Sequence, residues 1–185
     1  MHWEALFADL EAQAAALASA ERAAEIDERT RGETGSLHVV DRMRAAIDAP
    51  LRARLTGGHS ARGRLSRAGP DWLLLAEDTG TESVIALDAL VTLRGLGRYS
   101  ATPDGAGIVE SRLGLRHVLR GLVRDRAAVR LLLVDGSALD ATLDRVGADF
   151  VEAAIHPAAE LRRRAAVRDV ALVPLRALVA IRRLG

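Results

Sequence analysis

The sequence has no cysteine, no lysine and no asparagine, and aromatic residues make up only 3% of its 185 positions. The absence of cysteine excludes disulfide bonds and thiol chemistry. Because lysine is absent, all 26 basic residues are arginine, which we interpret chiefly as the bias of a GC-rich genome. With so few aromatic residues, we expect a core built from leucine, valine, isoleucine and alanine.

Long hydrophobic runs are also missing. No segment approaches the roughly 20 consecutive apolar residues that a membrane-spanning helix needs, and Glu4, Asp9 and Glu11 interrupt the apolar pattern at the N-terminus. We therefore expect a cytoplasmic protein with no membrane partner. The net charge of +1 hides an asymmetry, since residues 1–36 carry eight acidic residues against three arginines.

The first segment, residues 1–31, is predicted to be a long acidic helix, because it lacks glycine and proline before Gly32 and is rich in alanine, glutamate and leucine. Its apolar residues recur on one face in the first half, as in a coiled coil. This face predicts a homodimer or a docked protein partner; the alternative is packing on the same chain. The oligomerisation residues that we expect are Trp3, Leu6, Leu10 and Leu17.

The rest of the chain is an internal duplication. Residues 51–75 align without a gap on residues 129–153, and residues 85–94 align on 173–182. Turn-forming residues divide each copy into five short stretches of strand-forming residues, the pattern of a small barrel. The expected strands are 51–56, 61–67, 72–76, 82–87 and 90–95 in the first copy, and 129–134, 138–145, 150–155, 170–174 and 178–183 in the second.

These patterns predict a mainly β protein with some helix. A short helix, 37–47 or 112–125, precedes each set of strands, so we expect a first barrel with its helix at 37–96, a linker at 97–111 and a second barrel with its helix at 112–185. Trp72 and Phe150 occupy equivalent positions and are expected in the cores. Asp71 is expected to form a turn by accepting hydrogen bonds from nearby backbone N–H groups.

Several motifs resemble those of Sm-like proteins, in the broader class of SH3-like barrels. In the second copy they are Asp135-Gly136, Ala141-x-Leu143 and Asp149, and in the first they are Gly58, Gly63-x-Leu65 and Asp71. The resemblance implies two five-stranded Sm-like barrels and an association with RNA. Sm-like proteins carry a base-contacting asparagine four residues after the last aspartate, where this sequence has Leu75 and Ala153.

Arginines cluster in two places in the second copy. Four recur every four residues along the predicted helix, and a further group lies in a loop between the third and fourth strands. Such groups bind nucleic-acid phosphates or an acidic protein partner. The binding residues that we expect are Arg112, Arg116, Arg120, Arg124, Arg162, Arg163 and Arg164.

The motifs of known enzyme classes are missing. No glycine-rich phosphate loop, zinc-binding spacing or nucleophile elbow occurs, so we expect no enzyme, no metal and no cofactor. Two functions remain. The first is a binding module that associates with RNA or another nucleic acid in a regulatory role through its arginines. The alternative is an assembly scaffold that dimerises or docks a protein through the N-terminal helix.

Overall fold

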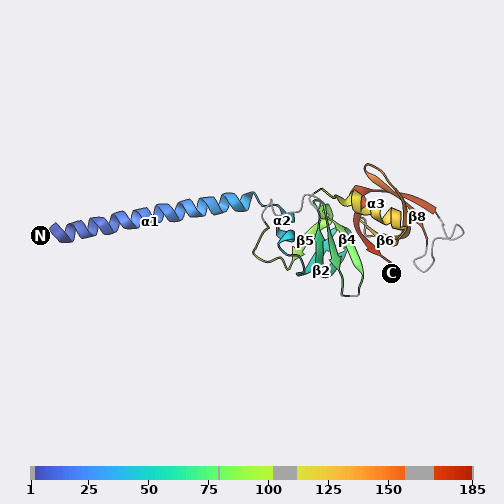
Figure 1. Cartoon of the computed structure of the whole chain (residues 1–185), viewed down its shortest axis with the longest axis horizontal. Coiled ribbons are helices and arrows are strands. Elements are labelled where there is room, and N and C mark those ends of the chain that lie inside the picture. The colour runs from blue at the N-terminus through green and yellow to red at the C-terminus, as the bar shows by residue number, and fades with distance from the viewer. Residues whose placement is uncertain (1–2, 79, 102–111, 157–168, 185) are drawn as a thin grey trace. The chain divides into compact units, whose positions relative to one another are not determined.

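A computed structural model describes residues 3–78, 80–101, 112–156 and 169–184, without the side chains of residues 5, 6 and 33. The chain divides into two compact units, Met1–His38 and Val39–Gly185. The first consists of one helix and the second is mainly β (Figure 1). None of the described helices combines the length and the apolar character that crossing a membrane requires.

Helix α1 (Trp3–Gly35) is longer than predicted, because the expected break at Gly32 does not occur. A glycine inside a helix costs about 1 kcal/mol, which a helix of 33 residues tolerates. The last turns are supported by local contacts. The Thr34 hydroxyl donates to the Thr30 carbonyl at 2.8 Å, and Arg31 lies 3.1 Å from Glu28.

The second unit begins with a short helix, α2 (Val39–Arg44), and contains α3 (Leu115–Asp125) between the two sets of strands. Both are shorter than predicted. The predicted start of α3 at Arg112 is wrong: Asp71 Oδ1 accepts a hydrogen bond from the Leu115 backbone N–H at 2.7 Å and so caps the helix at that point. The Asp71 side chain therefore caps a helix that is distant in the sequence, whereas the prediction placed its hydrogen bonds in its own turn.

All ten predicted strands are present, and every neighbouring pair is antiparallel. They are β1 (Pro50–Leu55), β2 (Ser60–Ala68), β3 (Trp72–Ala76), β4 (Glu82–Ala86), β5 (Leu90–Arg94), β6 (Ala128–Leu133), β7 (Ala138–Val146), β8 (Phe150–Ile155), β9 (Asp169–Pro174) and β10 (Leu178–Arg183). Single 3-10 turns cover Thr56–Gly58, Leu87–Ala89 and Leu175–Ala177. The strands form one sheet in the order β5-β1-β2-β3-β4-β10-β6-β7-β8-β9.

The duplication is visible in atomic detail. The register of β2 on β3 shifts between Leu65 and Arg67, and that of β7 on β8 shifts at the equivalent pair, Leu143 and Arg145. A Cβ on Gly69 would lie 2.2 Å from the Trp72 ring, and one on Gly147 would lie 2.4 Å from the Phe150 ring. The repeated glycines therefore make room for the repeated aromatic rings. The five strands of each copy also follow one another in the same order, and we call these sets the first and second halves of the sheet.

The two halves meet where β4 pairs with β10, with Ile181 opposite Val84 and Arg182 opposite Ser83. Ile181 is buried there together with Ile85 and Ala180. Two separate barrels are therefore not confirmed, because this pairing merges both sets of strands into one sheet. The fully buried side chains also include Leu51, Leu65, Leu73, Leu119 and Leu131, which confirms an aliphatic core.

Candidate functional site

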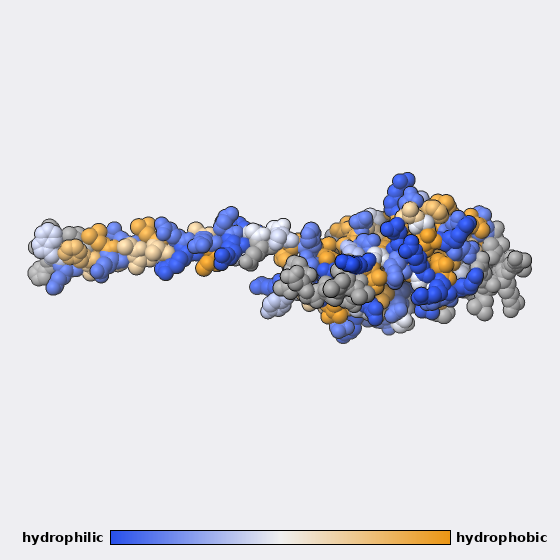
Figure 2. Space-filling model, turned by 45° about the horizontal axis from the view of Figure 1, so that its top comes forward, coloured by the Kyte–Doolittle hydropathy of each residue, from blue (hydrophilic) through white to orange (hydrophobic). Residues whose placement is uncertain are grey.

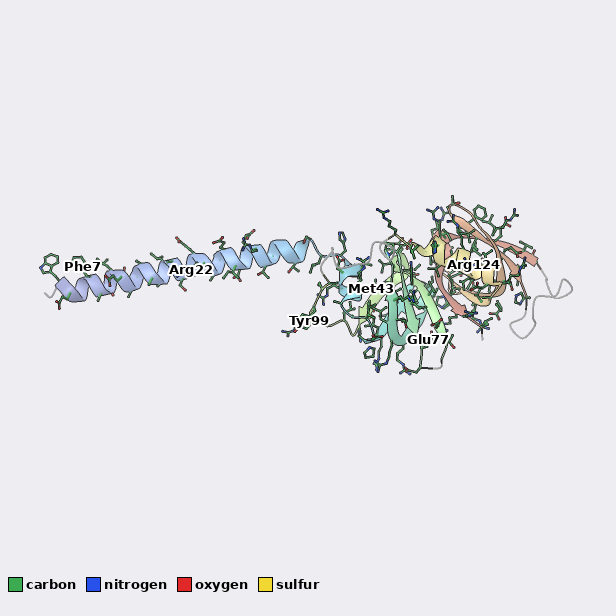
Figure 3. All side chains as sticks on the ribbon, viewed as in Figure 1. Phe7, Arg22, Met43, Glu77, Tyr99 and Arg124 are labelled. Carbon is green, nitrogen blue, oxygen red and sulfur yellow. The ribbon has the colours of Figure 1, made fainter. Side chains whose placement is uncertain are left out.

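The structure places three of the predicted binding arginines on one helix. Arg116, Arg120 and Arg124 lie exposed on α3, whereas Arg112 is exposed but precedes the helix. The Arg116 guanidinium donates to the Ala148 carbonyl at 3.2 Å, and Arg124, labelled in Figure 3, lies 3.8 Å from Asp125. The loop residues Arg162, Arg163 and Arg164 lie outside the described residues.

The predicted oligomerisation residues lie on α1, where polar and apolar surfaces alternate along the helix (Figure 2). Trp3, Leu10 and Leu17 are 71%, 50% and 66% exposed. The side chain of Leu6 lies outside the described residues.

A larger group of arginines lies on three adjacent strands of the first half. We call it the arginine face, and it consists of Arg52 and Arg54 on β1, Arg62 and Arg64 on β2, and Arg94 on β5. Burial alternates along β1 and most of β2, so the arginines point to solvent while Leu51, Ala53 and Leu65 point into the core. The strand period of two therefore places these arginines on one side of the sheet.

Register brings three of these arginines into a row. Arg52 lies directly opposite Arg62 on one side and Arg94 on the other. Residues directly opposite on antiparallel strands have Cβ atoms about 5 Å apart, and like charges there are destabilising. The row Arg62–Arg52–Arg94 thus concentrates positive charge at a cost to stability.

Few acidic groups compensate this charge. Arg62 lies 3.7 Å from Asp78, in a pair exposed on both sides, and Arg64 donates to the Asp48 carbonyl at 2.8 Å. Within the described part of the chain, no acidic partner lies within ion-pair distance of Arg52, Arg54 or Arg94. Their guanidinium groups are therefore available to an anion from solution.

A hollow of about 480 Å³ opens on this face, and we call it the arginine hollow. Its lining residues are Arg52, Ala53, Arg54, Ser60, Ala61, Arg62, Glu77, Asp78, Thr92, Arg94 and Arg182. A second hollow of about 300 Å³ contains Asp71 and Asp88 beside Arg116 and Arg176, so its charges balance. Only the first of these two hollows has a clear excess of positive charge.

Arg182 reaches the arginine hollow from β10, in the second half. Its Nη2 donates to the Ser60 carbonyl at 3.2 Å, and its Nε lies 3.3 Å from Glu77 Oε1. The same Glu77 oxygen accepts a hydrogen bond from the Ser83 hydroxyl at 2.6 Å; Glu77 is labelled in Figure 3. Glu77 is thus engaged in holding Arg182 in place.

In the second half of the sheet, the equivalent positions do not form a row of three arginines. Arg130 corresponds to Arg52 and lies opposite Arg182 on β10, but on its other side it faces Asp140, where the first half has Arg62. Arg130 Nε and Nη2 donate to the two Asp140 carboxylate oxygens at 2.6 and 2.8 Å. These hydrogen bonds lower the pKa of Asp140 and raise that of Arg130. One copy therefore neutralises this position, and the other leaves it charged.

The described residues offer no metal site. They contain no cluster of three or more histidine, aspartate and glutamate side chains suited to a metal ion. The buried His156 is hydrogen-bonded to the Thr142 hydroxyl at 2.7 Å. Among the described residues, the arginine face therefore has the clearest chemical character, which is a concentration of positive charge.

No protein-family model matches the chain, and a search of curated proteins finds no match. The sequence did contain a signal for the arginine face. Arg52 and Arg54, like Arg62 and Arg64, are two residues apart in predicted strands, which places each pair on one side of its strand. The register that aligns β2, β1 and β5 was the missing information.

Proposed function

We propose that this protein is a non-enzymatic module that binds nucleic acid, with single-stranded RNA as the expected partner and a regulatory role. In this proposal the two halves of the sheet are Sm-like barrels, and the arginine face of the first half contacts the phosphates. The observation that carries the proposal is the row Arg62–Arg52–Arg94, which faces solvent without the ion pair present in the second half.

The chemistry of the face favours phosphates over bases. Arginine offers a planar fork of donors that matches phosphate oxygens. Base recognition in single strands relies on aromatic stacking, but the sequence has only five aromatic residues, and none of them lines the arginine hollow. Binding should therefore depend strongly on salt and little on sequence.

The size of the face sets the expected salt dependence. If all five arginines neutralise phosphates of a single strand, log K should fall with log salt at a slope of about −3.5. Affinity should then drop about 100-fold between 50 and 200 mM salt. A slope near zero would contradict phosphate binding.

Two variants with equal charge change test the location of the site. Arg52→Gln/Arg94→Gln removes two arginines from the face, and Arg116→Gln/Arg120→Gln removes two from α3. Fluorescence anisotropy with a labelled single-stranded RNA of mixed sequence, measured over a salt series, compares both with the unmodified protein. We expect the first variant to bind at least 10-fold more weakly, with a slope reduced by about 1.4.

The second variant should bind within twofold of the unmodified protein. Thermal unfolding of both variants shows that lost binding does not reflect lost structure. Unchanged binding by Arg52→Gln/Arg94→Gln would disprove the proposed site, and lost binding by Arg116→Gln/Arg120→Gln alone would place the interface on α3.

A second candidate function, assembly through α1, rests on the exposed apolar side chains of that helix. Trp3, Leu10 and Leu17 share one face, and pairing with a second copy would bury them. Light scattering after gel filtration should show a dimer that Leu10→Glu/Leu17→Glu converts to a monomer. The matched control, Ala8→Glu/Ala15→Glu on the opposite face, should remain dimeric. A monomeric unmodified protein would exclude this function.

A further inference from the structure

The arginine hollow differs from the rest of the arginine face because arginines surround it from both halves of the sheet. Arg52, Arg54, Arg62 and Arg94 come from the first half, and Arg182 comes from β10 in the second. The acidic residues among the described part of the lining are Glu77 and Asp78, so these lining residues carry an excess of three positive charges. A flat face can accept a chain of phosphates, whereas this hollow can surround a single group.

The other lining residues narrow the class of ligand. The side chains of Ala53 and Ala61 are buried, and the remaining side-chain donors are the hydroxyls of Ser60 and Thr92. These residues offer hydrogen bonds and positive charge but no surface on which a base or a large apolar group would stack. The group that is recognised must therefore be a compact anion rich in acceptor oxygens.

A phosphate monoester fits this description better than the diester of a nucleic-acid backbone. A monoester carries close to two negative charges at neutral pH and has three terminal oxygens. A diester carries one charge and has two such oxygens. Several converging guanidinium groups gain most from the ligand with more charge and more acceptors.

Arg182 belongs to the second half of the sheet, so residues from both halves line the hollow. Glu77 and the Ser60 carbonyl fix the guanidinium group at 3.3 and 3.2 Å, and the side chain remains 31% exposed. Its position depends on the pairing of β10 with β4, where Arg182 lies opposite Ser83. The hollow is therefore complete only in the merged sheet.

We propose that the arginine hollow binds a terminal phosphate, the monoester group found at a nucleic-acid end or on a free nucleotide. This inference rests on the proposed nucleic-acid function and adds a preference for chain ends to it. Arg52, Arg54 and Arg94 bind the phosphate from the first half, and Arg182 binds it from the second.

The test uses the full chain and one 12-nucleotide RNA sequence in three forms: with a 5′-phosphate, with a 3′-phosphate and with hydroxyls at both ends. The label is internal, so that both ends remain free. We expect at least one phosphorylated form to bind about 10-fold more tightly than the hydroxyl form. Arg182→Gln should abolish this preference and leave the salt-dependent binding of the hydroxyl form within twofold.

The matched control is Arg183→Gln, since Arg183 is the exposed neighbour on the same strand and does not line the hollow. It should keep the preference. Arg54→Gln should lose it, which tests the hollow from the first half, where the junction is not altered. Equal affinity of the unmodified protein for all three RNAs would overturn the preference for chain ends while leaving the proposed function intact.

A final arm separates the hollow from the function of the whole face. Isothermal titration with adenosine monophosphate and with adenosine, for the unmodified protein and Arg182→Gln, requires no nucleic-acid chain. If the unmodified protein binds adenosine monophosphate but not adenosine, and Arg182→Gln binds neither, the hollow is supported as a nucleotide site even if none of the RNAs binds. If neither the phosphorylated RNAs nor the monophosphate shows a preference, the hollow is not a phosphate site.

Discussion

Replacing Arg62 by aspartate should make the protein more stable and a weaker RNA binder. The substitution copies the second half, where Asp140 takes the equivalent position and forms a two-bond ion pair with Arg130. In the first half, the new carboxylate would face Arg52 across the same register. It would remove a like-charge pair and add an ion pair, and it would give up the exposed contact of Arg62 with Asp78 at 3.7 Å.

The stability gain can be estimated from the second half. Arg130 and Asp140 are 44% and 21% exposed, so their pair belongs to the surface class, worth about 0.2–1 kcal/mol. Relief of the repulsion between Arg62 and Arg52 is of similar size. After allowance for solvent screening and for the lost surface contact with Asp78, we expect a gain of about 0.5–1 kcal/mol, or about 1–4 °C in Tm.

Binding should change in the opposite direction. Arg62 no longer contacts a phosphate, and Arg52 becomes occupied by the carboxylate. The loss of two contacts lowers the slope of log K against log salt by about 1.4, which is about 25-fold in affinity at 0.1 M salt. Thermal unfolding and an anisotropy salt series on the same samples measure the two effects.

The reciprocal substitution, Asp140→Arg, should lower stability and steepen the salt slope. Arg120→Asp on α3 changes the net charge by the same amount as Arg62→Asp, but it should neither raise the stability nor lower the salt slope. The reasoning is refuted if Arg62→Asp destabilises the protein, or if it binds RNA as tightly as the unmodified chain.

Two further outcomes follow from the structure. The hydrogen bonds from Arg130 lower the pKa of Asp140 in the folded protein. The stability that they provide is therefore complete above about pH 4 and is lost as the pH falls through that lower pKa. Asp140→Asn should flatten the dependence of Tm on pH in this acidic range. Gly69→Ala should cost about 1–3 kcal/mol in denaturant unfolding, because its Cβ would overlap the Trp72 ring; an unchanged midpoint would contradict this close packing.

Much of the sheet could be predicted because the chain contains it twice. Strands β3 and β8 begin and end where the alternating pattern and the flanking turns placed them. Trp72 is buried as predicted. Gly32 misled the prediction of α1, because the sum of many helix-forming residues outweighed one unfavourable residue.

The arginine face was harder to predict, because it depends on contacts between distant residues. Arg52 and Arg94 are far apart in the chain and become neighbours only through the pairing of β1 with β5. Arg182 joins them through the pairing of β10 with β4. A composition bias toward arginine explains why the residue type is common, but it carries no information about strand register.

The pairing of β4 with β10 also sets an order for folding during synthesis. Residues 87 to 177 separate the two strands, so β4 leaves the ribosome long before its partner exists. At about 5–20 residues per second, the delay is roughly 5–20 s. During that time β4 is an unprotected sheet edge, which favours pairing with other chains. We therefore expect β4 to be the segment of this protein that most needs a chaperone.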